Sequence, residues 1–390
     1  MGPPVVPGSG QAVKPPVQEP REAVWPAGDS GLLLQLDAFR GLSALLVLAS
    51  HLAQLFWLPF VAADSVLVPL LATLARHAVL LFFLLSGFFI ALSIRRNTLA
   101  NGRFDALEFG LARVARLYPP LVGALLLTAA CVAAQELPGG QPVAAGAPAW
   151  TLKADAIEYG GALLFAGGLE GANPVLWSLN FEARLYLLAA MVAWAATRGR
   201  WMHLISLAAV ALGVYTVLQT PAFAVFAAVW VLGAGVALAP PSWVRARRRL
   251  SVAALLVFVL LALGSPARLS VTEPQPMWLA ANHLLAAGAY CALLFDWRFA
   301  ARVLRWPART APLSYTLYLV HWPLLVLLLK MMQPEVQQRP VLAAVGTAIG
   351  AALALVVAWT LARWLEQPTW FAARLREAMG RTARGLETRT

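Results

Sequence analysis

Residues 36–52 read LDAFRGLSALLVLASHL, an apolar run that also carries Asp37, Arg40 and His51. Of the 390 residues in the chain, 60% are hydrophobic and 12% are charged. Soluble domains are typically about 45–50% apolar and about 25% charged. A water-soluble fold of this size could not cover so much apolar side chain, so the composition predicts that lipid surrounds the protein.

Further apolar runs follow along the chain, each close to the ~20 residues that a helix needs to cross a bilayer. The sequence therefore predicts an all-α fold, a polytopic integral membrane helical bundle of about ten transmembrane spans. The predicted spans are 38–57, 78–94, 118–135, 176–197, 201–218, 222–239, 250–265, 277–295, 312–330 and 341–363.

The basic residues alternate between the two sides of this predicted bundle. One set of connections, together with both ends of the chain, holds 24 of the 30 Lys and Arg residues. Because basic connections remain in the cytoplasm, this pattern predicts that both termini are cytoplasmic. We expect a proline-rich disordered tail over 1–30, a transmembrane domain over 31–367 and a basic cytoplasmic tail over 368–390. A short interfacial helix is predicted at 152–166, in the longest outer connection.

Composition also bears on partners and metals. The net charge is +12, but the arginines lie between apolar runs and not on one patch. This placement indicates contact with anionic membrane lipid and not with nucleic acid. The two cysteines, Cys131 and Cys291, lie in apolar runs, and no Cys/His cluster has the spacing of a zinc site. The sequence therefore predicts neither a disulfide framework nor a metal site.

Arg40 and His51 are eleven residues apart, which places them on one face of a helix and ~16 Å apart along its axis. Arg40 would lie at the cytoplasmic mouth and His51 well inside the bilayer. Ionisable groups inside a membrane usually mark functional sites, and neutral imidazole suits a general base. The alternative is a structural histidine bonded to a neighbouring hydroxyl or carbonyl.

Arg113 and Arg116 are three residues apart, so they share a helical face at the cytoplasmic start of the third span. Such a pair could clamp phosphates, although basic residues beside a span also serve as membrane anchors. Glu182 lies near the outer end of the fourth span. A carboxylate there must be paired, protonated or facing water, and it could orient His51 or contact a hydroxylated substrate.

The ninth span contains the polar stretch SYTLYLVH, in which spacings of four and three place Ser314, Tyr318 and His321 on one face. That face could line a cavity, or it could form hydrogen bonds between helices. Together, the segment around Glu182 and this stretch of the ninth span supply the candidate substrate-binding residues Trp177, Ser178, Tyr186, Ser314, Tyr318 and His321. In the second span, Ser86 and Gly87 are small residues best explained by close helix packing.

Five segments, in this order, resemble the acyltransferase 3 family of bacterial membrane proteins over about residues 31–367. They are LDAFRG with His51 ten residues beyond Arg40, FFLLSGF, RVARLYP, LWSLNFEARLYLL and SYTLYLVHWP. The resemblance implies transfer of an acyl group, usually acetyl, from cytoplasmic acyl-CoA to a hydroxyl of a carbohydrate or glycolipid. It implies a bacterial inner-membrane protein with acyl-CoA as co-substrate and no tightly bound cofactor.

The resemblance also assigns roles to individual residues. His51 matches the presumed catalytic histidine, and Arg40 is its motif partner. Arg113 and Arg116 match an arginine pair associated with donor binding, and Glu182 matches a motif glutamate that we take as a second catalytic candidate. Two other functions fit ten spans around a polar cavity: a transporter or exporter of a glycan or lipid-linked product, and a non-catalytic scaffold for polysaccharide synthesis.

Overall fold

The computed structural model describes residues 30–62, 65, 67–135, 152–197, 201–239, 305–333 and 335–387. Most of these residues are helical, and no strand occurs within the described ranges. The longer helices are α1 (Ser30–Phe56), α2 (Leu67–Asn101), α3 (Ala106–Ala134), α5 (Trp177–Thr197), α6 (Met202–Gln219), α7 (Ala222–Leu238), α12 (Ser314–Met332), α13 (Pro340–Leu365) and α14 (Pro368–Glu387). Shorter ones are α4 (Ala156–Leu163), α11 (Arg305–Ala308), η1 (Leu58–Phe60), η2 (Pro174–Leu176), η5 (Ala311–Leu313) and η6 (Glu335–Gln337).

The helical membrane fold predicted from the sequence is confirmed. Seven helices in the described ranges are long and apolar enough to cross a membrane, and α7 is a shorter apolar helix. The predicted spans 250–265 and 277–295 lie outside the described residues, as do residues 1–29 of the tail predicted over 1–30; Ser30 begins α1. The total of ten spans therefore stays a prediction. The short helix expected at 152–166 is present as α4.

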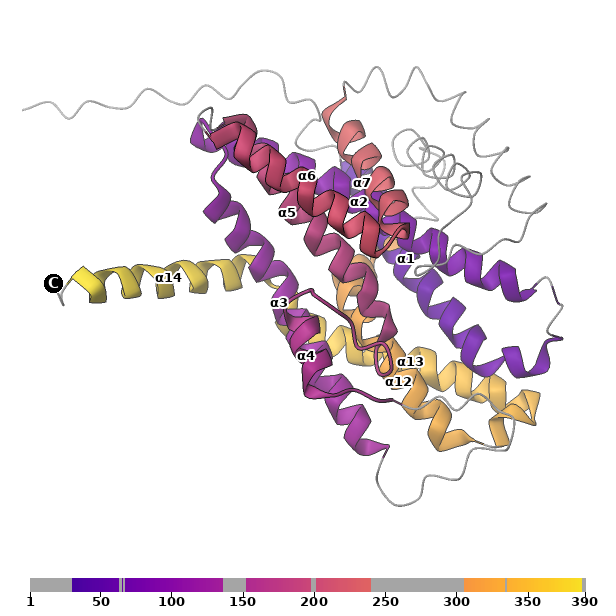
Figure 1. Cartoon of the computed structure of the whole chain (residues 1–390). Helices are drawn as coiled ribbons and strands as arrows, with labels where there is room; N and C mark the ends of the chain where they lie inside the picture. Colours follow the sequence, from indigo (N-terminus) through magenta and orange to yellow (C-terminus); the bar gives the residue numbers. More distant parts are fainter. Residues whose placement is uncertain are drawn as a thin grey trace, which may run out of the picture.

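The bundle is held together by close crossings between helices far apart in sequence. Helix α2 packs along α1 and α7, and α12 packs against α1, α3 and α13 (Figure 1). At the α2–α7 crossing, a Cβ on Gly87 would lie 1.9 Å from the carbonyl oxygen of Trp230. A Cβ on Gly233 would lie 2.0 Å from the carbonyl oxygen of Leu84. Only glycine permits this mutual backbone approach, which is typical of helix packing in lipid.

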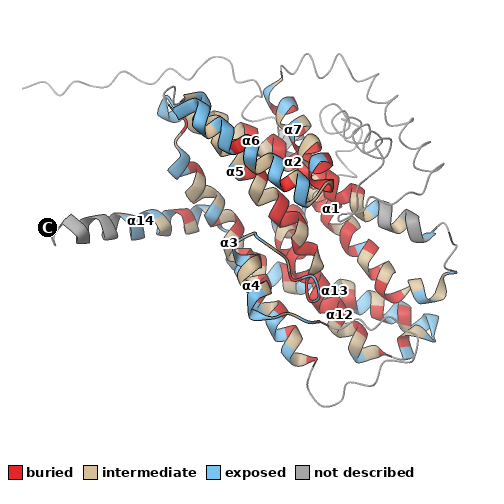
Figure 2. Ribbon diagram, viewed as in Figure 1, coloured by how far each residue is buried: buried red, intermediate tan, exposed pale blue. Residues whose placement is uncertain are grey.

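Apolar side chains cover much of the outside of the bundle, as expected for a lipid-facing surface. Helix α6 is the clearest case, because most of its surface is exposed in Figure 2 although the helix is apolar. The exposed apolar residues of α6 include Leu204, Leu207, Val210, Val214 and Leu218. By contrast, α12 is buried along most of its length.

The predicted basic tail over 368–390 contains a helix. Helix α14 runs sideways from the end of α13 and away from the bundle (Figure 1), and it contacts the first part of α3. Arg376 of α14 forms an ion pair with Glu108 of α3. In the described part of α14, Pro368, Phe371, Ala372 and Leu375 are the less exposed residues, while Trp370 and Arg374 are exposed. The helix therefore forms part of the wall at one end of the bundle.

Candidate functional site

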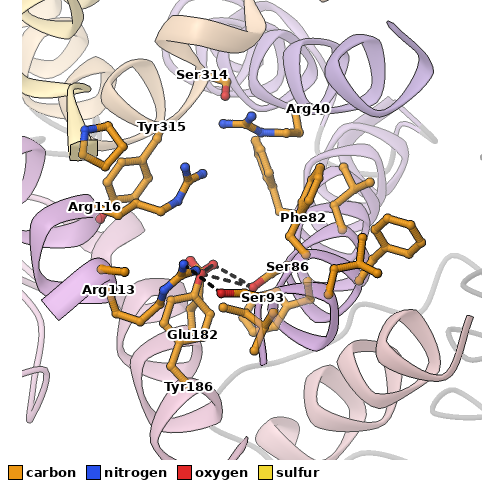
Figure 3. A pocket seen from close by; sticks show the side chains of 18 of the residues that line it. Arg40, Phe82, Ser86, Ser93, Arg113, Arg116, Glu182, Tyr186, Ser314 and Tyr315 are labelled. Atoms are coloured by element: carbon orange, nitrogen blue, oxygen red, sulfur yellow. Dashed lines mark hydrogen bonds between the residues drawn. The ribbon is translucent and has the colours of Figure 1, made fainter. Parts of the chain in front are cut away.

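A cavity of about 700 Å³ opens at the end of the bundle where α1, α2, α3, α5, α12 and α14 meet (Figure 3). Its volume is in the range that ligand and cofactor pockets usually have. Most of its apolar lining comes from α2, and polar or charged side chains come from every helix that lines it. The polar and charged lining residues are Arg40, Ser86, Ser93, Arg96, Arg113, Arg116, Ser178, Glu182, Tyr186, Ser314, Tyr315, Tyr318, Thr369 and Arg376.

The charge of this lining is strongly positive. Arg40, Arg113 and Arg116 extend into one open space from α1 and α3 (Figure 3), and Arg96 and Arg376 add two further guanidinium groups. Glu182 is the single carboxylate among the described lining residues. We call this end of the bundle the basic end. Arg376 is ion-paired with Glu108 and Arg40 with Asp37, which leaves Arg96, Arg113 and Arg116 against Glu182. This excess of positive charge, partly shielded from water, favours an anionic ligand with several negative groups.

Arg113 is the most constrained of these arginines. Its Nη2 donates to Ser93 Oγ at 3.3 Å, and its guanidinium lies over the ring of Tyr186 at 5.8 Å. Its Nε is buried and has no hydrogen-bond partner within the described part of the chain. A buried donor without an acceptor is costly, so this nitrogen is one that a ligand would satisfy. Arg116 and Arg40 lie close enough for their charges to interact.

Glu182 lies on the cavity side of α5 and not beside His51. Its Oε1 accepts hydrogen bonds from Ser86 Oγ at 2.8 Å and from the Tyr186 hydroxyl. Glu182 also lies close enough to Arg113 for an electrostatic interaction. The expectation that Glu182 lies on the opposite side from the arginines, or orients His51, is therefore wrong. Ser86 also differs from expectation, because it bonds to this carboxylate, whereas Gly87 serves packing as predicted.

The polar residues of α12 divide between the cavity and a second cluster. Ser314 and Tyr318 line the cavity, and the Tyr318 hydroxyl donates to the carbonyl oxygen of Val175 at 3.0 Å. The same hydroxyl lies 2.7 Å from Ser178 Oγ, so two of the predicted substrate-binding hydroxyls are bonded to each other. His321 is fully buried and does not line the cavity. The single polar face predicted for α12 therefore serves two different environments.

The second cluster contains His51. Its Nδ1 lies 2.8 Å from Nε2 of His321, with the two rings nearly parallel. The ring of Trp322 packs edge-on against His51 at 4.9 Å between centroids. Arg76, whose charge acts on His51, lies over the ring of Trp177 at 5.3 Å. Neither His51 nor Trp177 lines the cavity.

Tyr318 connects the cavity and the histidine cluster. Its side chain lines the cavity, and its ring centroid lies 6.1 Å from that of His321 and 5.8 Å from that of Phe82, another lining residue. Among the described residues, Tyr318 therefore both lines the cavity and contacts the histidine pair. Arg40 and His51 are on one face of α1 as predicted, but the cavity does not extend along that whole face in this structure.

Several residues that shape the site were not among the sequence candidates. Arg76, Arg96 and Arg376 are ordinary members of basic or apolar runs, and only the tertiary structure places them at the site. Ser93 is a lone hydroxyl in α2 that becomes a partner of Arg113. A signal existed for Arg76, because an arginine beside an apolar stretch needs compensation. Within the described residues, no group of three or more His, Cys, Asp or Glu could hold a metal ion.

No curated protein and no solved structure matched this chain. A family model described as an acyltransferase domain matches residues 33–363, which is most of the chain and includes every site residue named above except those of α14. The match, with apolar helices long enough to cross a membrane, identifies the protein as a membrane acyltransferase of the acyltransferase 3 family.

Proposed function

We propose that this protein is an O-acyltransferase that moves an acyl group, acetyl as the first candidate, from cytoplasmic acyl-CoA to a hydroxyl of a glycan or glycolipid. The observation that carries the proposal is an arginine-lined cavity with a histidine cluster just beyond it, behind Tyr318. Acyl-CoA has phosphate groups at one end and a thioester at the other. A cavity with this distribution of charge suits such a donor.

The basic end faces the cytoplasm in this proposal. Support comes from the sequence, where 24 of the 30 Lys and Arg residues fall on one side of the alternating spans. Arg40, Arg113 and Arg116 bind the phosphates of the donor with charge-assisted hydrogen bonds. Their excess positive charge also raises the local concentration of an anionic donor at the mouth. The protein would then be an inner-membrane enzyme with both termini in the cytoplasm.

The donor's acyl-pantetheine arm extends through the cavity toward His51. Arg40 and His51 are separated by ~16 Å along α1, a span that an extended arm can cover. Tyr318 stands between the cavity and the histidines. We propose that its side chain rotates, breaking its hydrogen bonds to Val175 and Ser178, to let the thioester pass.

Acyl transfer then proceeds by general-base catalysis. The acceptor hydroxyl enters from the opposite side, near Arg76 and Trp177. His51 takes its proton as the oxygen attacks the thioester carbonyl, the C–O bond forms and the C–S bond breaks. The thiolate of CoA leaves and takes up the proton from His51. A positioned general base contributes typically ~10²–10⁴ in rate. Glu182 acts on the donor side, where it holds Ser86 and Tyr186 beside Arg113.

Mass spectrometry of surface glycans tests this function in cells. A bacterial host that lacks the gene would be complemented with the wild-type protein or with His51→Ala, at matched membrane levels. We expect the wild type to add the mass of one acyl group to a glycan and the variant to add almost none. Equal acylation by both proteins would overturn the assignment of His51. Movement of a glycan into proteoliposomes without release of CoA would instead identify a transporter.

A further inference from the structure

The histidine pair has a defined hydrogen-bonding direction, which follows from the surroundings of His321. This residue belongs to α12 and is fully buried. Its Nδ1 lies 3.0 Å from the carbonyl oxygen of Leu317, one turn earlier in the same helix. A carbonyl oxygen can only accept, so Nδ1 of His321 must carry the hydrogen. The opposite tautomer would place two lone pairs against each other in a buried site.

The tautomer of His321 also fixes the tautomer of His51. With its hydrogen on Nδ1, neutral His321 presents a lone pair at Nε2. That atom lies 2.8 Å from Nδ1 of His51, which must therefore donate. The lone pair of His51 is then on Nε2, the nitrogen that is left to act as a base. The chain from Leu317 through His321 to His51 thus sets one tautomer at the proposed base.

We propose that His321 is a positioning residue that holds His51 in the tautomer with its lone pair on Nε2, an inference that rests on the proposed function of His51 as the base. The hydrogen bond persists when His51 takes the proton of the acceptor hydroxyl, since Nδ1–H of the imidazolium still donates to His321. An acceptor on Nδ1–H plays the same part for the catalytic histidine of serine hydrolases. Here a neutral imidazole replaces the carboxylate that those enzymes use.

Packing limits the other orientations of the His51 ring. Trp322 follows His321 in α12, and its ring meets His51 edge-on at an interplanar angle of 81°. The rings of His51 and His321 are 11° from parallel with centroids 5.1 Å apart. A flip of His51 about its Cβ–Cγ bond would move Nδ1 away from its partner, with the loss of a buried hydrogen bond. His321 was a substrate-binding candidate, and its burial assigns it this indirect role instead.

Nitrogen NMR of the full-length protein in nanodiscs tests the tautomer without any acyl transfer. The chain has five histidines, so ¹⁵N-histidine labelling gives a small set of ring signals. His51→Gln and His321→Gln variants would assign the two pairs. We expect a protonated-type shift for Nδ1 and an unprotonated-type shift for Nε2 in both His51 and His321. The reverse pattern at His51, or a protonated Nε2 at His321, would overturn the inference.

Activity of two His321 variants tests the positioning role. In His321→Gln the side-chain amide can still donate toward Leu317 and accept from His51, whereas His321→Phe keeps the ring volume but has no acceptor. We expect His321→Phe to lower kcat about 100-fold, within the range of a lost general base, with KM for acetyl-CoA changed less than about 2-fold. His321→Gln should keep at least about a tenth of wild-type kcat.

The two readouts also separate this inference from the proposed function. Equal kcat losses in His321→Gln and His321→Phe, or no loss in either, would overturn the positioning role. Full activity of His51→Ala would overturn the proposed function, whatever the tautomer of the wild-type protein. The NMR pattern decides the tautomer in either case, because it is measured in the absence of donor and acceptor.

Discussion

Replacement of Arg113 by glutamine should weaken donor binding. Arg113 lines the cavity with a buried Nε that has no partner within the described residues, and its guanidinium is held by Ser93 and Tyr186. A hydrogen bond to a charged group contributes about 1.5–3 kcal/mol, which corresponds to about 10- to 150-fold in affinity. We expect the lower half of that range, because Arg40 and Arg116 remain in the cavity and retain much of its positive charge.

Calorimetric titration with a non-reactive thioether analogue of acetyl-CoA, in nanodiscs, measures this loss. Arg309→Gln is the matched control, because it removes the same charge from an exposed arginine outside the cavity. We expect the control to bind within about 2-fold of wild type, because a solvent-exposed charge is screened by salt. Arg113→Lys should fall between the two, since it keeps the charge and loses the fork of donors. Equal affinities of Arg113→Gln and Arg309→Gln would refute the donor site.

Three other substitutions test separate parts of the structure. Gly87→Leu should destabilise the bundle by about 1–3 kcal/mol or more in thermal unfolding, because its side chain would meet backbone, whereas Gly213→Leu, in open space, should not. Glu182→Gln should tighten binding of the anionic analogue in the same titration, since it removes the one carboxylate found among the described lining residues; a lower kcat with unchanged binding would instead indicate a catalytic carboxylate. Tyr318→Phe removes the hydrogen bonds to Val175 and Ser178. If rotation of this ring limits turnover, the variant should release CoA faster than wild type, whereas an unchanged rate would show that ring rotation is not limiting.

Local sequence patterns predicted the features that depend on one helix at a time. Apolar run length located seven of the eight predicted spans that fall within the described residues, and the eighth, 222–239, is the shorter apolar helix α7. Helical spacing predicted that Arg113 and Arg116 share a face, and both line the cavity. The same reasoning predicted that Ser314 and Tyr318 share a face, and of the two readings left open for that face, lining a cavity and bonding between helices, both apply to Tyr318. These successes share a cause: helix geometry fixes the relative directions of residues three or four apart.

The sequence did not predict which helices contact one another. The hydrogen bond between His51 and His321 joins residues 270 positions apart, and no periodicity reveals which helices are neighbours. Glu182 was predicted to lie away from the arginines. A span boundary shows how far a residue is from the end of its helix, but not which neighbouring side chains it meets, and Glu182 meets Ser86. Lipid-facing and buried helix faces are both apolar in a membrane protein, so the hydrophobic pattern that orients helices in water is weak here.

The C-terminal segment shows the same limit. Its composition predicted a basic tail, yet α14 contributes Arg376 to the cavity and an ion pair with Glu108. The matched family domain ends at residue 363, before this helix begins. Its amphipathic pattern was readable, but the position of the helix depends on its contact with α3. Such a contact is a tertiary feature.

Acyl transfer by the purified protein tests the central claim most directly. Proteoliposomes would receive acetyl-CoA with a labelled acetyl group and a glycan fraction from the host, and the label in the glycan would be measured over time. His203→Ala is the matched control, because His203 is an exposed histidine on α6. We predict transfer by the wild type and the control, and a rate lower by about 10²–10⁴ for His51→Ala. Equal rates for all three proteins would contradict the account.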